Sequence, residues 1–161
     1  MKTIVVYYSL GGNTKSAAEK IASELGCGLL EIVPEQSIPA KGFKSILVGG
    51  KQAVFGERPR IRELKPDPKD YDAIILGTPI WAGRCAAPVW TFLSEFEAKE
   101  RVIAVFTLSG SGDNTKCISR LEKLLSEMKL SVSLVDKNTA KSADNAKKLD
   151  EFIGALKADI K

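Results

Sequence analysis

The chain has 161 residues, of which 44% are hydrophobic and 27% charged, and its formal net charge is +4. This length and composition predict a single globular domain over residues 1–161. No apolar run approaches the roughly 20 residues of a membrane-spanning helix. Histidine is absent, which excludes Ser-His-Asp and Cys-His nucleophiles and His-ligated zinc, and we expect no metal site.

The cysteines and the charges predict an ordinary cytoplasmic protein. Cys27, Cys85 and Cys117 lie far apart without a C-x-x-C motif, as expected of reduced thiols. Cys85 is expected near a helix start, where a thiol pKa can fall, although a small buried apolar role is the simpler interpretation. Residues 41–70 contain eight Lys/Arg and four Asp/Glu. Their excess of four positive charges equals the net charge of the whole chain. Few aromatic residues and no recognition motif accompany these charges, so we expect no nucleic-acid partner.

Alternating strand and helix patterns run through the chain. Continuous apolar runs predict buried strands, and apolar residues three and four positions apart predict amphipathic helices. In chain order the patterns are strand 4–8, helix 17–25, strand 29–33, helix 41–53, an irregular basic arm over 54–70, strand 73–76, helix 88–96, strand 102–106, helix 118–128, strand 132–135 and helix 149–156.

This alternation predicts an α/β fold, namely a three-layer doubly wound domain around a five-stranded parallel sheet, because each parallel pair needs a right-handed crossover. Ligands of such folds bind at the carboxyl ends of the strands, and we expect the arm 54–70 at the opposite end. The candidate site residues follow the first, third and fourth strands: Ser9, Leu10, Gly11, Gly12, Asn13 and Thr14; Thr78, Pro79, Ile80, Trp81, Ala82 and Gly83; Ser109, Gly110, Ser111, Gly112, Asp113 and Asn114.

The first of these loops combines bare backbone with polar side chains at a helix start. Gly11 and Gly12 let backbone N–H groups close around a phosphate, and Ser9, Asn13 and Thr14 can add donors. A plain turn with one capping residue is the alternative, but it needs fewer small and polar residues. The loop lacks the Gly-Lys pair of a P-loop and the chain has no G-x-G-x-x-G, so we expect neither an NTPase nor a dinucleotide-type site.

The other two loops suit a planar heterocycle. Trp81 lies between Pro79 and Gly83, where its indole can stack on a ring, whereas Trp90 belongs to a helix stripe and is expected in the core. Residues 109–114 offer hydroxyls and backbone groups for the polar edge of the ring. A phosphate cradle, an aromatic side chain and a polar edge together describe a flavin mononucleotide (FMN) site.

With these three loops the chain resembles the flavodoxin family over essentially its whole length. The resemblance implies the strand order 2-1-3-4-5 and FMN as the cofactor. It places residues 9–14 at the phosphate, 78–83 beside the isoalloxazine and 109–114 at its pyrimidine edge. The chain looks like the short-chain type, since no loop is inserted in the fifth strand. Arg84 and the positive net charge differ from the electron carriers of the family, which are commonly acidic.

We therefore expect a protein that binds FMN non-covalently and transfers electrons between redox partner proteins, with no catalytic side chain. The alternative is an FMN-dependent oxidoreductase that takes hydride from NAD(P)H and reduces a quinone-type acceptor. A flavin-free receiver domain is not expected, because Tyr8-Ser9 stands where its acidic cluster would lie. We expect no membrane partner, and a monomer or weak homodimer.

Overall fold

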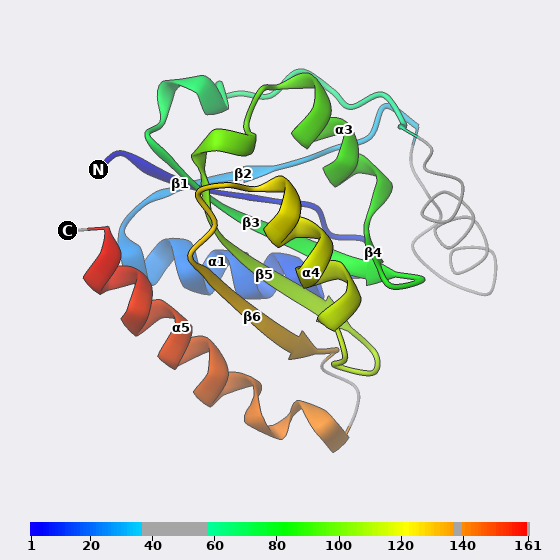
Figure 1. The fold of residues 1–161 in the computed structure, drawn as a ribbon, viewed down its shortest axis with the longest axis vertical. Helices are drawn as coiled ribbons and strands as arrows, with labels where there is room; N and C mark the ends of the chain where they lie inside the picture. Colours follow the sequence, from blue (N-terminus) through cyan, green and yellow to red (C-terminus); the bar gives the residue numbers. More distant parts are fainter. Residues whose placement is uncertain (37–57, 137–139, 161) are drawn as a thin grey trace.

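Five parallel strands form the centre of the computed structural model, which describes residues 1–36, 58–136 and 140–160 (Figure 1). Their order across the sheet is β2-β1-β3-β5-β6, which confirms the predicted order of a doubly wound fold. A short strand, β4, pairs antiparallel with the end of β3. The strands are β1 (Thr3–Tyr7), β2 (Gly28–Glu31), β3 (Ala73–Trp81), β4 (Arg84–Cys85), β5 (Val102–Ser109) and β6 (Leu130–Val135).

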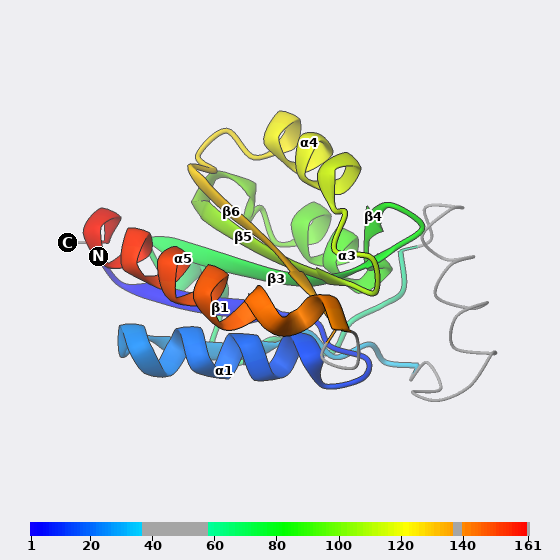
Figure 2. The same cartoon turned by 90° about the horizontal axis from the view of Figure 1, so that it is seen from below.

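Helices cover both faces of the sheet. The α-helices are α1 (Asn13–Leu25), α3 (Ala87–Glu95), α4 (Thr115–Leu124) and α5 (Asn145–Asp159), with short 3-10 helices η1 (Pro68–Asp70), η2 (Lys99–Arg101) and η3 (Ala140–Asp144). Helices α1 and α5 pack side by side on one face, and α3 and α4 lie on the other (Figure 2). None of these helices, the longest of which has 15 residues, is long and apolar enough to cross a membrane.

The two faces have separate cores, and the alternation of side chains along the strands fills both. Val5 and Tyr7 of β1 pack with α1 and α5. Ile4 and Val6 point the other way and pack with α3 and α4. Because strands buried on both faces are apolar throughout, these runs were recognisable in the sequence.

Some predicted bounds were wrong. Helix α4 ends at Leu124, short of the predicted 128, and the predicted helix 41–53 lies outside the described residues. Strand β3 continues to Trp81 instead of ending at 76. Its pairing with β1 stops at Gly77, whereas its pairing with β5 continues to Pro79. Pro79 is therefore tolerated, because one side of β3 is already a free edge where no N–H is needed.

The basic arm does not lie wholly at the far end of the sheet, so this expectation was also wrong for its described part. The backbone of Ile61 bridges that of Pro34, just beyond the carboxyl end of β2. The Thr91 hydroxyl in α3 donates a hydrogen bond to the Pro59 carbonyl at 2.8 Å. From there the chain runs back along the sheet to η1 near the amino end (Figure 1). A parallel strand must be entered from the amino edge, and the arm is part of this return path.

Gly77 is the one place in β3 where a side chain has no room. It lies opposite Phe106 of β5 in the sheet register. A Cβ built on Gly77 overlaps the Phe106 ring, which is fully buried. The missing side chain therefore lets a large aromatic ring pack directly on the backbone of the central strand.

We expect Gly77→Ala to lower the free energy of unfolding by about 1–3 kcal/mol, because the buried ring must shift to admit a methyl group. Gly154→Ala is the matched control: Gly154 lies in α5 with open space around its Cα, and alanine there should add up to about 1 kcal/mol through helix propensity. Urea denaturation of both variants checks that the free energy of unfolding falls in the first and rises in the second. A neutral Gly77→Ala would mean that Phe106 does not pack on this strand.

Two of the three cysteines meet in the core between β4 and α4. Cys85 and Cys117 are each 1% exposed. The hydrogen bond with the Cys117 thiol, together with burial, raises the pKa of Cys85 well above its ordinary value. Cys27 is partly exposed, and burial raises its pKa as well. This environment matches the simpler interpretation of Cys85 as a small buried residue and not as an activated thiol.

The hydrogen bond with Cys85 lowers the pKa of Cys117, but burial keeps both of these thiols from the reagent. Alkylation with iodoacetamide at about pH 8 should therefore modify only Cys27, and slowly, since its raised pKa reduces its thiolate fraction. Cys85 and Cys117 should react only when the protein unfolds. Peptide mass spectrometry of native and urea-unfolded samples locates the label, and a Cys27→Ser variant should remain unlabelled while folded. Rapid labelling of Cys85 in the native protein contradicts its burial.

Candidate functional site

The first loop leaves β1 and folds on its own serine. The Ser9 hydroxyl accepts a hydrogen bond from the backbone N–H of Gly12 at 3.1 Å. Gly12 has a φ of 90°, a left-handed conformation that favours glycine. A Cβ built on Gly11 or Gly12 meets no atom within 4 Å, so the space above the loop is open.

The start of α1 presents backbone donors to this open space. No side chain caps the helix, and its first turn contains no acidic residue. Among the described residues, the backbone N–H groups of Asn13, Thr14 and Lys15 find no acceptor. The helix dipole adds partial positive charge at the same point. This arrangement suits an anion such as a phosphate.

The second predicted loop is a β-hairpin. Thr78 to Trp81 belong to β3, and only Ala82 and Gly83 form the turn to β4. Both turn residues have positive φ, 49° and 72°, as a type I′ turn requires. Thr78 is fully buried, and its hydroxyl accepts from the Ala86 N–H at 3.1 Å. The Thr78 side chain thus holds the hairpin to α3 instead of lining the site.

Trp81, at the end of β3, packs against the end of β1. Its ring and that of Tyr8 lie edge to face, with centroids 5.7 Å apart and planes at 89°. Tyr8 is 3% exposed, and burial raises its pKa to about 12, so the phenol is neutral at physiological pH. Tyr8 thereby fixes the position of the partly exposed Trp81 without adding charge. Trp90, expected in the core, is only partly buried and packs at the core's margin.

The third loop is held by its own side chains. The Ser109 hydroxyl accepts from the Gly112 N–H at 2.9 Å. The Asp113 carboxylate accepts from the Thr115 hydroxyl at 2.8 Å, and this bond lowers the pKa of Asp113. Asn114 is buried and donates to the Thr107 hydroxyl at 2.7 Å. Gly110 and Ser111 remain exposed at the tip, where their backbone is available to a ligand.

Contacts that run through neighbouring residues link the three predicted loops. The Asn13 amide donates to Asp136, just after β6, at 3.3 Å, and the Asp136 N–H donates to the Ser109 carbonyl at 3.0 Å. Tyr8 and Trp81 join the first loop to the hairpin. The Lys116 side chain lies 3.8 Å from a Cβ built on Gly83, which brings the start of α4 to the hairpin. The structure therefore brings the predicted loops together at the carboxyl edge of the sheet, where they form the candidate site.

Sequence reasoning missed three members of this site: Tyr8, Lys116 and Asp136. Asp136 follows the last strand of the sheet, so the same carboxyl-edge rule could have identified it. Tyr8 was assigned to a strand, and nothing in the sequence indicated that it supports Trp81. Lys116 reaches the hairpin only because β4 folds back toward α4, which the sequence pattern does not predict.

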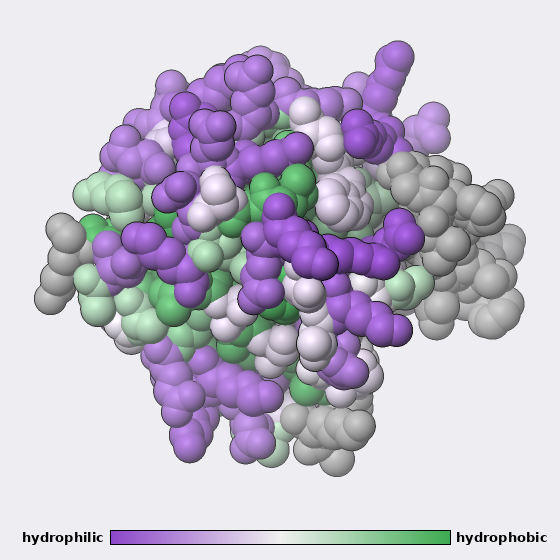
Figure 3. All heavy atoms as spheres, in the orientation of Figure 1, coloured by the Kyte–Doolittle hydropathy of each residue, from purple (hydrophilic) through white to green (hydrophobic). Residues whose placement is uncertain are grey.

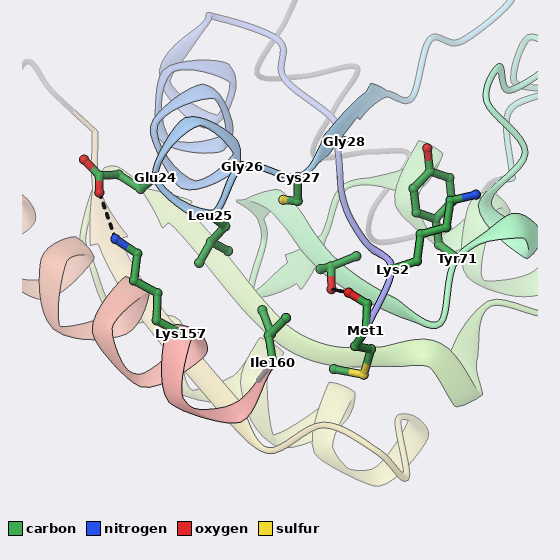
Figure 4. A pocket seen from close by; sticks show the side chains of 11 residues that line it. Met1, Lys2, Glu24, Leu25, Gly26, Cys27, Gly28, Tyr71, Lys157 and Ile160 are labelled. Atoms are coloured by element: carbon green, nitrogen blue, oxygen red, sulfur yellow. Dashed lines mark hydrogen bonds and ion pairs between the residues drawn. The ribbon is translucent and has the colours of Figure 1, made fainter.

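A cavity of about 580 Å³ lies at the opposite, amino end of the sheet (Figure 4). It is lined by the chain start and the ends of α1 and α5, with Leu25, Cys27 and Ile160 among its apolar residues. The ion pair between Lys157 and Glu24, at 3.0 Å, crosses its rim. None of the predicted site residues lines it. Because doubly wound folds bind ligands at the carboxyl edge, the joined loops remain the candidate site despite this cavity.

Solved structures of flavoproteins resemble this chain over most of its length. A flavoprotein from Lactobacillus acidophilus NCFM, solved in complex with FMN, is 30% identical, covers 91% of this chain and 97% of its own, and superposes with a TM-score of 0.67. A flavoprotein structure from Bacteroides eggerthii is 26% identical, with coverages of 94% and 97% and a TM-score of 0.67. Oxidised flavodoxin 2 from Bacillus cereus shares the fold at 18% identity, with coverages of 99% and 99% and a TM-score of 0.63.

A sequence model of a protein family adds an independent comparison. The model described as flavodoxin matches residues 2–152, which is nearly the whole chain. It spans all three joined loops, and its fold agrees with the observed strand order. The chain therefore belongs to the flavodoxin family.

Proposed function

We propose that this chain binds FMN non-covalently at the three joined loops and carries electrons between redox partners. The start of α1 is the observation that carries this proposal, because its uncapped N–H groups lie above an open glycine loop with no acid in the first turn. The FMN complex of the Lactobacillus relative supports the choice of flavin.

The residues at the α1 end fit a terminal phosphate. Ser9, Asn13 and Thr14 supply polar side chains beside the backbone donors, and a Cβ-free surface at Gly11 and Gly12 leaves room for the oxygens. A phosphate at a helix start gains from both the donors and the dipole. These residues distinguish FMN from riboflavin, which lacks the phosphate.

The other two loops fit the ring. Trp81 and the Ala82–Gly83 turn would lie beside it, and the exposed backbone of Gly110 and Ser111 would hydrogen-bond its polar edge. When bound, the flavin supplies one- and two-electron chemistry. The chain's part is to bind and orient it and to keep a neutral phenol, Tyr8, behind the indole.

An FMN-dependent NAD(P)H:quinone-type oxidoreductase is the second candidate. The observation in its favour is that Arg84 and Lys116, beside the hairpin turn, make no ion pair among the described residues. Such cations could hold the phosphates of a nicotinamide nucleotide. An electron carrier needs no such second ligand. A cytoplasmic location and a monomeric or weakly dimeric state remain predictions for either function.

Thr14→Val should weaken FMN binding without changing riboflavin binding. Valine keeps the shape of the buried threonine and removes only its hydroxyl, and a hydrogen bond to a charged group contributes about 1.5–3 kcal/mol, or roughly 10- to 100-fold in affinity. Titration of the apoprotein with each flavin measures this, with Thr3→Val at the other end of β1 as the control. Equal weakening of both flavins would show that the loop does not hold the phosphate.

Flavin fluorescence should report on Trp81. An indole beside the ring quenches flavin emission, so Trp81→Phe should raise the fluorescence of the bound FMN several-fold. Trp90→Phe changes a tryptophan in α3 that belongs to none of the three loops and should leave the fluorescence unchanged. If emission responds to Trp90 instead, the ring lies elsewhere.

An anaerobic absorbance spectrum separates the two candidate functions. An FMN-loaded carrier should keep its oxidised flavin spectrum when NADPH or NADH alone is added, and should bleach only when a separate reductase is present. Prompt bleaching by NAD(P)H alone, with turnover on a quinone, would instead establish the oxidoreductase.

A further inference from the structure

A group of basic side chains lies beside the hairpin turn of the candidate site. Lys116, Arg120 and Lys123 occupy positions i, i+4 and i+7 of α4 and therefore share one helix face. Arg84, in β4, follows the turn directly. We call these four residues the α4 basic surface. Figure 3 shows hydrophilic side chains gathered over α4 on this face of the molecule.

This helix face is turned toward the hairpin. Lys116 lies against the turn, 3.8 Å from a Cβ built on Gly83. The positive charge of Arg120 acts on the thiol of Cys85 in β4 and lowers its pKa slightly, against the larger effects that raise it. Lys116 and Arg120 of the helix thus lie near Gly83 and Cys85 of the hairpin that carries Trp81.

The α4 basic surface is not neutralised within the described part of the chain. None of its four residues belongs to the five ion pairs found there, which instead engage Lys20, Lys65, Lys129, Lys147 and Lys157. Lys116, Arg120 and Lys123 are exposed. Of the neighbouring acids, Asp113 already accepts hydrogen bonds from the Thr115 hydroxyl and N–H. Glu122, in α4 itself, belongs to none of these five ion pairs.

The size of the surface favours a protein partner over a small anion. Lys123 lies seven positions after Lys116, which is about 10 Å along a helix, and Arg84 extends the surface onto the hairpin. One phosphate cannot contact cations so far apart on a convex helix face. A row of carboxylates on another protein can, and such complementarity accelerates encounter and sets orientation.

We propose that the α4 basic surface docks an acidic electron-transfer protein next to Trp81. The proposal rests on the proposed function, since it assigns a partner to the same site. The charges are reversed relative to the acidic electron carriers of the family. Here the flavoprotein supplies the positive surface and its partner the negative one. Docking at the hairpin brings the partner to the edge of the site where the ring would lie.

Two forms of one haem protein test the docking: basic native cytochrome c, and the same protein succinylated so that its lysines become carboxylates. FMN-loaded protein, reduced with dithionite and freed of excess, is mixed anaerobically with either form. Two ferric haems take one electron each from one two-electron-reduced flavin and become ferrous, and the flavin protons pass to solvent. Stopped-flow absorbance follows the ferrous haem.

The wild type should reduce the succinylated form about tenfold faster than the native form at low salt, and the ratio should approach one at about 0.5 M salt. Lys116→Glu/Arg120→Glu should remove or invert this preference. The control variant Lys69→Glu/Lys148→Glu changes the net charge by the same amount, in η1 and α5. It should keep the preference for the succinylated form. Should the glutamate pair not fold, Lys116→Gln/Arg120→Gln should still reduce the ratio.

Flavin content, measured first, distinguishes a failure of the proposed function from a failure of the docking proposal. A wild type that takes up no FMN refutes the proposed function itself. An FMN-loaded wild type without the salt-dependent preference, or one whose preference the α4 pair leaves intact, overturns the docking proposal alone. The proposal also fails if the α4 pair instead abolishes reduction by NADPH, or if it abolishes tight binding of a labelled DNA duplex while the cytochrome rates stay unchanged.

Discussion

The unequal pairing on the two sides of β3 determines how the site is built. Strand β1 stops pairing at Gly77, while β5 continues to Pro79. Beyond that point β3 has one free edge, and the chain uses it to turn back as β4. Since β1 has already ended, Tyr8 can lie under the hairpin and support Trp81. A longer β1 would occupy the space that the first loop and the hairpin share.

The sheet order and most helices could be predicted because they depend on the periodicity of apolar residues, which is visible in the sequence itself. The hairpin could not, because Gly-Thr-Pro normally ends a strand and only the early end of β1 permits it to continue. The direction of the basic arm depends on a bridge between Ile61 and Pro34, a long-range pairing with no local signature. Asp136 follows the last strand of the sheet, so the carboxyl-edge rule applies to it as well.

The site is chemically uneven from one end to the other. At the α1 end the backbone donors and the side chains of Ser9, Asn13 and Thr14 are neutral, and the Asn13 amide donates to the Asp136 carboxylate. At the hairpin end, Arg84 and Lys116 are basic, while the phenol behind the indole is neutral. The interior thus offers hydrogen bonds and aromatic surface, and full charges are kept to the rim. A polar ligand with one charged end fits such a gradient better than one charged throughout.

The uncapped start of α1 links folding to the supply of ligand. A helix end whose N–H groups have no protein acceptor lacks the stabilisation of roughly 1 kcal/mol that a capping side chain gives. An anion that binds only the folded chain makes up for this deficit and adds about 2.7 kcal/mol when present at 100 times its dissociation constant. The chain's resistance to proteolysis and heat would then follow the cell's cofactor pool as well as its own sequence. Core substitutions tolerated in flavin-rich cells could become damaging when flavin is scarce.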